Sequence, residues 1–157
     1  MLIKLALSLL LSCSSLSALA QNPLQEGAPV PVLALKNQHD KPADIPDNTR
    51  RILFAADNAA AELMTALLDA KAGNWLQETR QVYLADIHKM PGLISRMFAL
   101  PKLREKPYNI ILGREESDLA AWPRQKACVT LIPVTAGKLG KADYACSAAA
   151  LQNAVDR

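Results

Sequence analysis

Residues 51–71 read RILFAADNAAAELMTALLDAK, and this stretch decides the fold. After Arg51 the run to Ala56 is apolar without alternation, which predicts a central strand buried on both faces. Asn58 suits a helix N-cap, and Gly73 suits the end of a helix over 59–71. The apolar side chains of that helix recur at helical spacing at Leu63, Met64, Leu67 and Leu68.

Further strands and helices are expected on both sides of this unit. Apolar runs predict strands at 30–35, 82–85 and 108–112, and turn residues fill 37–42. Short helical turns are expected at 74–80 and 119–122.

A second amphipathic helix is expected between Pro91, which suits a first helical position, and Pro101, which limits it. Its apolar stripe consists of Leu93, Ile94, Met97 and Phe98. We interpret Met64, Met97 and Trp122 as core residues.

The C-terminal part carries the two cysteines that follow residue 20, Cys128 and Cys146. Residues 128–134 read as a strand, 135–138 as a turn and 139–146 as the returning strand. A hairpin centred on Gly137 places the two sulfurs opposite each other, which favours a structural disulfide. Two buried free thiols and a catalytic pair remain the alternatives. Ser147 then caps a final helix with Ala148, Leu151 and Val155 facing inward.

This order of elements predicts an α/β sandwich. Strands joined through helices are expected to be parallel, with right-handed crossovers, and the hairpin adds antiparallel strands at the edge. The expected architecture is therefore a central mixed sheet with helices on both faces, closed by a C-terminal β-hairpin plus helix.

The N-terminus is typical of a secretory signal peptide. Lys4 precedes an apolar core over 5–11, and Ala18-Leu19-Ala20 is a small-x-small cleavage site. We therefore expect residues 1–20 to be a signal peptide, 21–157 to be a single domain, and the protein to be periplasmic. The alternative is a lipoprotein anchored at Cys13, although Leu11 fits that cleavage box poorly.

Composition narrows the class of protein further. The 157 residues are 50% hydrophobic, 21% charged and 4% aromatic, with a formal net charge of +3. A chain of this kind forms a core of aliphatic side chains. It has no block of like charges that would predict nucleic-acid binding, and no second apolar run long enough to predict a membrane span.

Residues 27–42 read GAPVPVLALKNQHDKP, in which Gly-x-x-x-Pro leads to a short strand and then to a Gln-containing turn before Lys-Pro. This stretch resembles the N-terminus of thioredoxin-fold proteins of the peroxiredoxin-like (thiol-specific antioxidant) branch. Residues 52–68 resemble the central strand and first helix of that fold, and 130–155 its closing strands and helix. The resemblance implies a thioredoxin-like fold over about residues 26–156.

The catalytic cysteines that the resemblance implies are missing. Redox thioredoxins carry Cys-x-x-Cys at the start of the first helix, and peroxiredoxins carry a single cysteine there, whereas this chain has Asp57-Asn58-Ala59-Ala60. Val129 stands where the family has its cis-proline. Without a thiolate at that helix, the family's thiol chemistry has no nucleophile.

The sequence also resembles short exported bacterial proteins that carry the label of FAD/FMN-containing dehydrogenase. It has no Gly-x-Gly-x-x-Gly after a strand, and about 137 residues leave little room for a flavin domain and a substrate domain. We therefore expect no cofactor.

Polar residues follow two of the expected strands and define a possible ligand edge. Asp57 and Asn58 follow one strand, and Asp86 and His88 follow its neighbour. Carboxyl ends of parallel strands are where α/β sheets bind ligands, and an Asp–His pair can bind a metal or move protons. The alternative is that Asn58 only caps a helix, that Asp57 and Asp86 stabilise loops through hydrogen bonds, and that His88 is solvated. Two histidines without metal-ligand spacing argue against a zinc site.

Two functions remain open from the sequence. The first is an exported, redox-inactive domain that binds or scaffolds an unknown protein or small-molecule partner. The second is an oxidoreductase that uses Cys128 and Cys146 or a bound flavin. The oligomeric state is not predicted.

Overall fold

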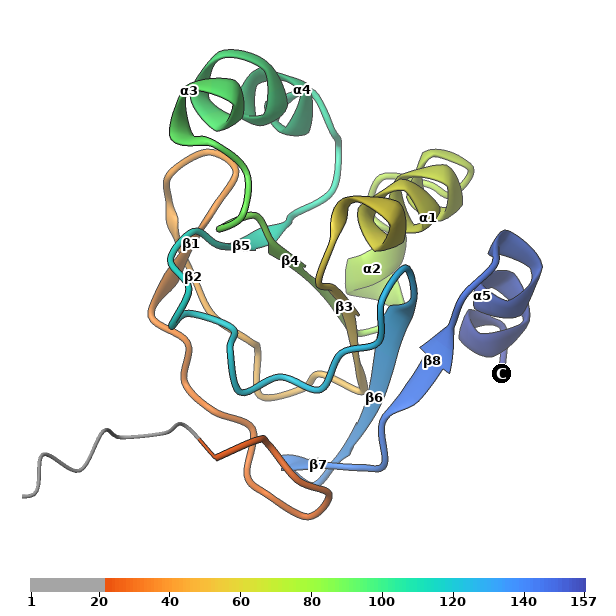
Figure 1. Cartoon of the computed structure of the whole chain (residues 1–157). Coiled ribbons are helices and arrows are strands. Elements are labelled where there is room, and N and C mark those ends of the chain that lie inside the picture. Colours follow the sequence, from red (N-terminus) through yellow and green to blue (C-terminus); the bar gives the residue numbers. More distant parts are fainter. Residues whose placement is uncertain (1–21) are drawn as a thin grey trace, which may run out of the picture.

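The computed structural model describes residues 22–157 as an α/β fold around one curled sheet (Figure 1). The predictions for residues 1–20 and for Cys13 lie outside the described residues. The strands are β1 (Leu35–Asn37), β2 (Pro42–Ala43), β3 (Arg51–Ala55), β4 (Gln81–Asp86), β5 (Ile111–Gly113), β6 (Val129–Thr135), β7 (Lys138–Leu139) and β8 (Asp143–Ala145). The helices are α1 (Asn58–Asp69), α2 (Trp75–Glu78), α3 (Gly92–Ile94), the π-helix η1 (Ser95–Ala99), α4 (Leu100–Arg104) and α5 (Ala148–Val155).

The centre of the sheet is parallel and its flanks are antiparallel, as expected for a mixed sheet. The strand order is β2-β1-β5-β4-β3-β6-β7, with β8 paired to β6. Strand β4 runs parallel to both β3 and β5, whereas β6 runs antiparallel to β3. Because β3 and β4 are parallel and in register, Ala55 and Ala85 lie side by side at the same end of the sheet.

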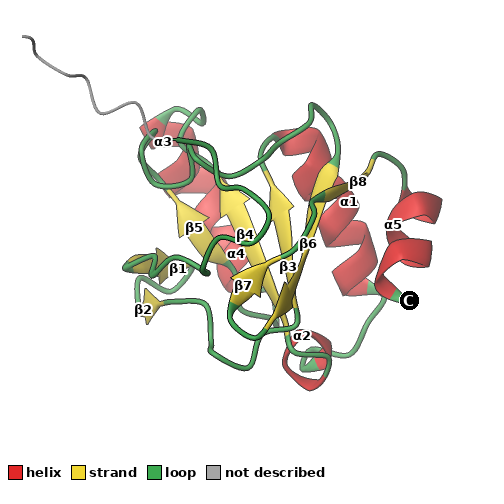
Figure 2. Cartoon of the chain, turned by 90° about the horizontal axis from the view of Figure 1, so that it is seen from below, coloured by secondary structure: helices red, strands yellow, loops and turns green. Residues whose placement is uncertain are grey.

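Side chains alternate between two hydrophobic clusters on the two faces of the sheet. Leu53 and Ala55 belong to one cluster, and Ile52 and Phe54 belong to the other. The first cluster contains buried residues of α1, α2, α4 and α5, and Figure 2 shows α1 and α5 packed beside each other. The second cluster is closed by irregular segments that include Leu24, Leu119 and Trp122. The fold class is confirmed, with the difference that loops rather than helices cover the second face.

The expected strand at 30–35 forms later, at β1. Pro29 and Pro31 lack backbone N–H groups and therefore cannot complete a ladder, and Ala34 has a positive φ of 40° that breaks the extended run. Only Pro29 makes an isolated bridge, to Lys138.

Strand β5 begins at Ile111 rather than Tyr108 because a side chain occupies the backbone groups of the preceding residues. The buried Gln38 donates from Nε2 to the carbonyl of Tyr108 (2.7 Å) and accepts at Oε1 from the N–H of Ile110 (2.9 Å). The side-chain amide of Gln38 thereby makes the two backbone hydrogen bonds that a neighbouring strand would otherwise make.

The helical segment 92–104 differs most from expectation. Met97 and Phe98, predicted to face inward, are 59% and 60% exposed, so the interpretation of Met97 as a core residue is wrong. Instead Leu100 is buried in the first cluster, with Leu103 packed against it. The segment also continues through Pro101, because this residue lies in the first turn of α4, where a helix does not need its N–H. Pro91 was expected at the first helical position, but it is the residue before it, and the helix begins at Gly92.

Residues 119–122 form turns rather than a helix, with the N–H of Trp122 donating to the carbonyl of Leu119 (3.1 Å). Both side chains are nevertheless buried, so the prediction that Trp122 belongs to the core is confirmed.

The C-terminal hairpin turns at Ala136 and Gly137, both with positive φ. The returning strand is split in two: β7 pairs Leu139 with Val134, and β8 pairs Ala145 with Val129. The register of β8 is the expected one and places Cys128 opposite Cys146. Ser147 caps α5 by accepting from the N–H of Ala150 (3.2 Å). Leu151 and Val155 face inward as expected, but Ala148 is exposed.

Candidate functional site

The start of α1 is organised by Asp57. Its backbone is extended (φ −152°), and its Oδ1 accepts from the N–H of Ala60 at 2.9 Å, which makes Asp57 the N-cap. The predicted cap, Asn58, is instead the first helical residue, and its Nδ2 donates to Glu62 Oε1 at 2.7 Å. The carboxylate of Asp57 also accepts at Oδ2 from the N–H of Ala127 (2.8 Å), so its two oxygens bind two separate segments of the chain.

The environment of Asp57 holds it ionised. Burial acts to raise its pKa, but the N–H groups of Ala60, Ala127 and Ala59 and the charge of Lys126 together lower the pKa below its ordinary value. The start of α1 therefore already carries a negative charge. The carboxylate of Asp57 accepts hydrogen bonds from the N–H groups that the first turn of the helix presents there.

At the end of the neighbouring strand, Asp86 contacts two partners, Arg124 and His88. Its side chain is 1% exposed and accepts from Arg124 Nη1 at 3.0 Å and contacts His88 Nδ1 at 2.6 Å. The guanidinium of Arg124 also donates to the carbonyl of Leu119 and lies over the ring of Phe54, 5.3 Å from its centroid. Asp86 and His88 therefore do meet, but the carboxylate is already fully engaged.

One loop, residues 123–127, supplies partners to both carboxylates. Arg124 binds Asp86 and the N–H of Ala127 binds Asp57, and the loop then runs directly into Cys128. An open depression of about 510 Å³ lies between this loop and the start of α1, lined by Ala56, Asp57, Asn58, Ala59, Lys89, Arg124, Gln125, Lys126 and Ala127. As a ligand edge, the set Asp57, Asn58, Asp86 and His88 stays a prediction.

A disulfide anchors the end of the same loop. Cys128 and Cys146 are bonded (S–S 2.01 Å) with their Cα atoms 4.1 Å apart. Cys128 is buried, whereas Cys146 is exposed and lies 3.6 Å from Gln125 Nε2. The bond lies at the same end of the sheet as the start of α1, because Val129 pairs with Ala55. Within residues 22–157 no peptide bond is cis, the one before Val129 included.

No cluster of three or more His, Cys, Asp or Glu side chains suited to a metal ion occurs in the described part of the chain. Likewise, none of the helices within residues 22–157 is long and apolar enough to cross a membrane.

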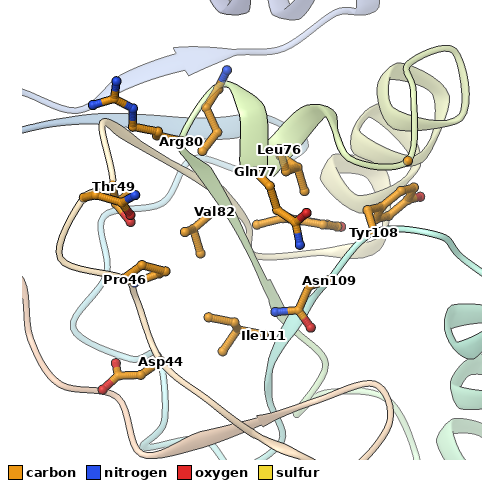
Figure 3. Close-up of a pocket in the computed structure, with 14 residues that line it drawn as sticks. Asp44, Pro46, Thr49, Leu76, Gln77, Arg80, Val82, Tyr108, Asn109 and Ile111 are labelled. Carbon is orange, nitrogen blue, oxygen red and sulfur yellow. The ribbon is translucent and has the colours of Figure 1, made fainter.

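A second cavity lies at the opposite, amino end of the central strands (Figure 3). It measures about 260 Å³ and has apolar walls that include Val82, Leu76 and Ile111. Two residues of its lining, Thr49 and Gln81, each have a buried side-chain oxygen, Oγ1 and Oε1, with no hydrogen-bond partner among the described residues. Unsatisfied buried polar atoms are costly, so this cavity is the better candidate for taking up a small ligand.

Solved structures with the same arrangement of elements identify the fold. The thioredoxin domain of a thiol-disulfide oxidoreductase from Bacteroides vulgatus has a TM-score of 0.56 at 13% identity, over 85% of this chain and 96% of that domain. The chain has a thioredoxin-like fold. The peroxidoxin BcpB of Mycobacterium tuberculosis (TM-score 0.55, 12% identity, 85% and 95% covered) shares it. So does a thioredoxin-like protein of Porphyromonas gingivalis (0.53, 16%, 84% and 92%).

At these identities the likeness shows the thioredoxin-like fold alone. No protein-family model matches the chain, and no curated protein sequence matches it. The expected thioredoxin-like fold is therefore confirmed, while the likeness gives no support to the flavin-dehydrogenase label.

Sequence reasoning missed Arg124, Thr49 and Gln81 as members of these sites. Arg124 follows Trp122-Pro123, and nothing in the sequence around it indicates that it pairs with Asp86. Thr49 and Gln81 stand beside or at the start of strands, where polar residues are common. Gln38 did carry a signal, since it stands in the turn motif of residues 37–42, but its burial was not foreseen.

Proposed function

We propose that this chain is an exported thioredoxin-like domain that binds a partner and does not catalyse thiol chemistry at its first helix. The observation that carries the proposal is the start of α1, where Asp57 accepts from the helix N–H groups and alanines follow. A thiolate is stabilised at such a helix end by those same N–H groups. Here an aspartate already uses them, and no sulfur precedes or opens the helix.

The binding site that the geometry favours is the cavity of Figure 3. Its unpartnered Thr49 hydroxyl and Gln81 amide oxygen suit a small neutral ligand that donates hydrogen bonds, such as a hydroxyl or amide compound, between apolar walls. The depression beside Asp57 is the second place for a partner, since Lys89 and Lys126 leave it cationic.

One observation favours a second function, an oxidoreductase that works through the disulfide. Cys146 is exposed, and the bond lies beside the start of α1. A substrate thiolate could attack Cys146 Sγ and release Cys128 as a thiolate. The second thiol of the substrate would then attack the mixed disulfide, leaving an oxidised substrate and a reduced cysteine pair.

Turnover assays distinguish the two functions. The purified protein and a Cys128→Ser/Cys146→Ser variant are compared for oxidation of a dithiol peptide and, with dithiothreitol supplied as the reductant, for acceleration of insulin disulfide reduction and of hydrogen peroxide consumption. Binding without catalysis predicts no acceleration by either protein. Acceleration by the unmodified chain that the variant lacks would establish the second function. A disulfide midpoint potential below about −300 mV would agree with a structural bond, and an absorbance spectrum checks for a bound flavin.

A further inference from the structure

The helical segment 92–104 presents an apolar face to solvent. Leu93, Ile94, Met97 and Phe98 are 70%, 48%, 59% and 60% exposed, and they recur at helical spacing across α3 and η1. These four side chains, called here the apolar face, make up most of the large hydrophobic residues that are exposed within the described part of the chain. Figure 1 shows α3 and α4 projecting at one end of the molecule, away from α1 and α5. Grouped exposure of this kind marks an interaction surface, whereas single exposed apolar residues are ordinary.

The opposite side of the same segment explains why this face remains outside. Leu100 is buried in the first hydrophobic cluster, and Leu103 packs against that cluster. Arg104 fixes the end of the segment by donating to the carbonyl of Gln38 (2.9 Å) and to Asp40 (2.6 Å). The segment is therefore held on the domain by its inner side, and the apolar face cannot turn inward without giving up those contacts.

The charges around the apolar face have one sign. Residues 87–104 contain Lys89, Arg96, Lys102 and Arg104 and no Asp or Glu. Only Arg104 of these four forms an ion pair within residues 22–157. Lys89, Arg96 and Lys102 are exposed; Arg96 lies between the apolar residues in the sequence, Lys89 precedes the segment and Lys102 lies in its last part. The nearest acidic residues along the chain are Asp86, which is buried, and Glu105, which follows the segment.

We propose that segment 92–104 docks the domain on an anionic lipid surface, lying in the plane of the membrane with its apolar face among the acyl chains. A short amphipathic helix with Phe and Leu on one side and Lys and Arg beside them is what such an interface binds. Each cation near an anionic surface adds attraction, and the apolar side chains add hydrophobic transfer. The complementarity of charge selects an anionic membrane over a neutral apolar protein surface. This docking does not depend on the cavity of Figure 3 or on the cysteines, and it shares only Lys89 with the depression beside Asp57.

Vesicle binding tests the proposal directly. Residues 22–157 hold both hydrophobic clusters and the disulfide, so this part of the chain is used, free of the preceding apolar segment. Sedimentation with phosphatidylglycerol/phosphatidylethanolamine vesicles should show binding that is at least about ten-fold stronger than with phosphatidylcholine vesicles. High salt should weaken it.

Variants at exposed positions locate the contact without threatening the fold. Met97→Ser/Phe98→Ser should weaken partitioning into the anionic vesicles by about ten-fold or more, since it removes two apolar side chains from the contact. Lys89→Gln/Arg96→Gln/Lys102→Gln should abolish the preference for anionic lipid. The matched control is Val32→Ser, which changes an 83% exposed apolar residue outside the segment and should leave binding unchanged.

A fluorescence measurement gives a second readout. Phe98→Trp should shift its emission to shorter wavelength when anionic vesicles are added, whereas Val32→Trp should not. Absence of vesicle binding, or binding that Met97→Ser/Phe98→Ser leaves unchanged, would overturn the proposal. A dimer in analytical ultracentrifugation that this variant abolishes, without any vesicle binding, would assign the face to a second copy of the chain instead.

Discussion

The two ends of the central strands differ in how their buried polar groups are satisfied. At the carboxyl end, Asp57 and Asp86 are each held by at least two partners, which include the N–H of Ala127 and the guanidinium of Arg124. At the amino end, Thr49 Oγ1 and Gln81 Oε1 line a cavity with no partner among residues 22–157.

This difference suggests that one end of the sheet contributes to the stability of the fold and that the other end could bind a ligand. At the carboxyl ends of β3 and β4, where α/β folds usually place their ligands, the two carboxylates are bonded within the chain, and the one buried side-chain atom without a partner among residues 22–157 near this end is Arg114 Nε, after β5. The amino end retains the unsatisfied hydrogen-bonding capacity that a ligand could use. Four predictions follow this contrast, from the largest expected effect to the smallest.

Removing the disulfide should weaken the carboxyl end most. Cys128→Ser/Cys146→Ser reopens a loop of 18-residue separation and should lower the free energy of unfolding by about 3 kcal/mol. Urea denaturation of the variant against the oxidised chain measures this loss, and reduction of the unmodified chain should reproduce it. An unchanged midpoint would mean that the loop 123–127 does not depend on its covalent anchor.

Arg124→Ala should cost about 2–3 kcal/mol of unfolding free energy. It leaves the 1% exposed Asp86 with only His88, and removes the contact with Phe54. The cost is set below that of a fully buried ion pair because Arg124 is itself about one-third exposed. Lys126→Ala, in the same loop, is the matched control and should change stability by less than about 0.5 kcal/mol. Equal effects of the two substitutions would contradict the assigned role of Arg124.

Asp57→Ala removes the N-cap of α1 and should cost about 1–2 kcal/mol. The pKa of Asp57 is lower in the folded chain than in the unfolded chain. Its charge therefore stabilises the fold fully above the unfolded value of about 3.9, and this contribution is lost as the pH falls through the lower folded value. Asp57→Asn should consequently flatten the decline of stability in the acid range, measured by urea denaturation at a series of pH values below neutrality. An acid decline as steep as that of the unmodified chain would rule out Asp57 as a contributor.

Two buried threonines compare the ends directly. Thr130 Oγ1 donates to the carbonyl of Pro123 at 3.0 Å, so Thr130→Val should destabilise by about 1–2 kcal/mol. Thr49 Oγ1 has no hydrogen-bond partner among residues 22–157, so Thr49→Val should leave stability unchanged or raise it slightly, while weakening the binding of any ligand in the cavity. Thermal unfolding of the two variants side by side is sufficient. A comparable loss from Thr49→Val would show that its hydroxyl is bonded after all.

The sequence predicted the fold class because burial leaves a strong pattern. Strands β3 and β4 lie at the centre of the sheet, where both faces are covered, so their sequences are apolar runs. Helix α1 packs on one of these faces, so its apolar residues form a stripe. The pairing of Cys128 with Cys146 was also predicted correctly, but the hairpin is not centred on Gly137 as expected. The turn pairs Thr135 with Lys138, and the register shifts by one residue between β7 and β8, so that Val129 pairs with Ala145.

Other features could not be obtained from the pattern alone. Helical spacing at Met97 and Phe98 identifies a face but does not say whether the face meets the core or the solvent. Asp57 rather than Asn58 is the N-cap, and its carboxylate also binds the N–H of Ala127, seventy residues away, a contact that the local sequence does not indicate. The residues of the predicted ligand edge lie at the ends of neighbouring strands, but their role as a ligand edge stays a prediction. Arg124, which forms the ion pair with Asp86, comes from a loop without a motif.

The shared loop 123–127 has a consequence for how the molecule opens. Because it contacts the ends of two adjacent strands through separate residues, a fluctuation that lifts it releases both contacts in one event. The amide hydrogens of Ala127, bonded to Asp57, and of Cys128, bonded to the carbonyl of Gln125, should therefore exchange with solvent deuterium at matching rates, as members of a single cooperative unit.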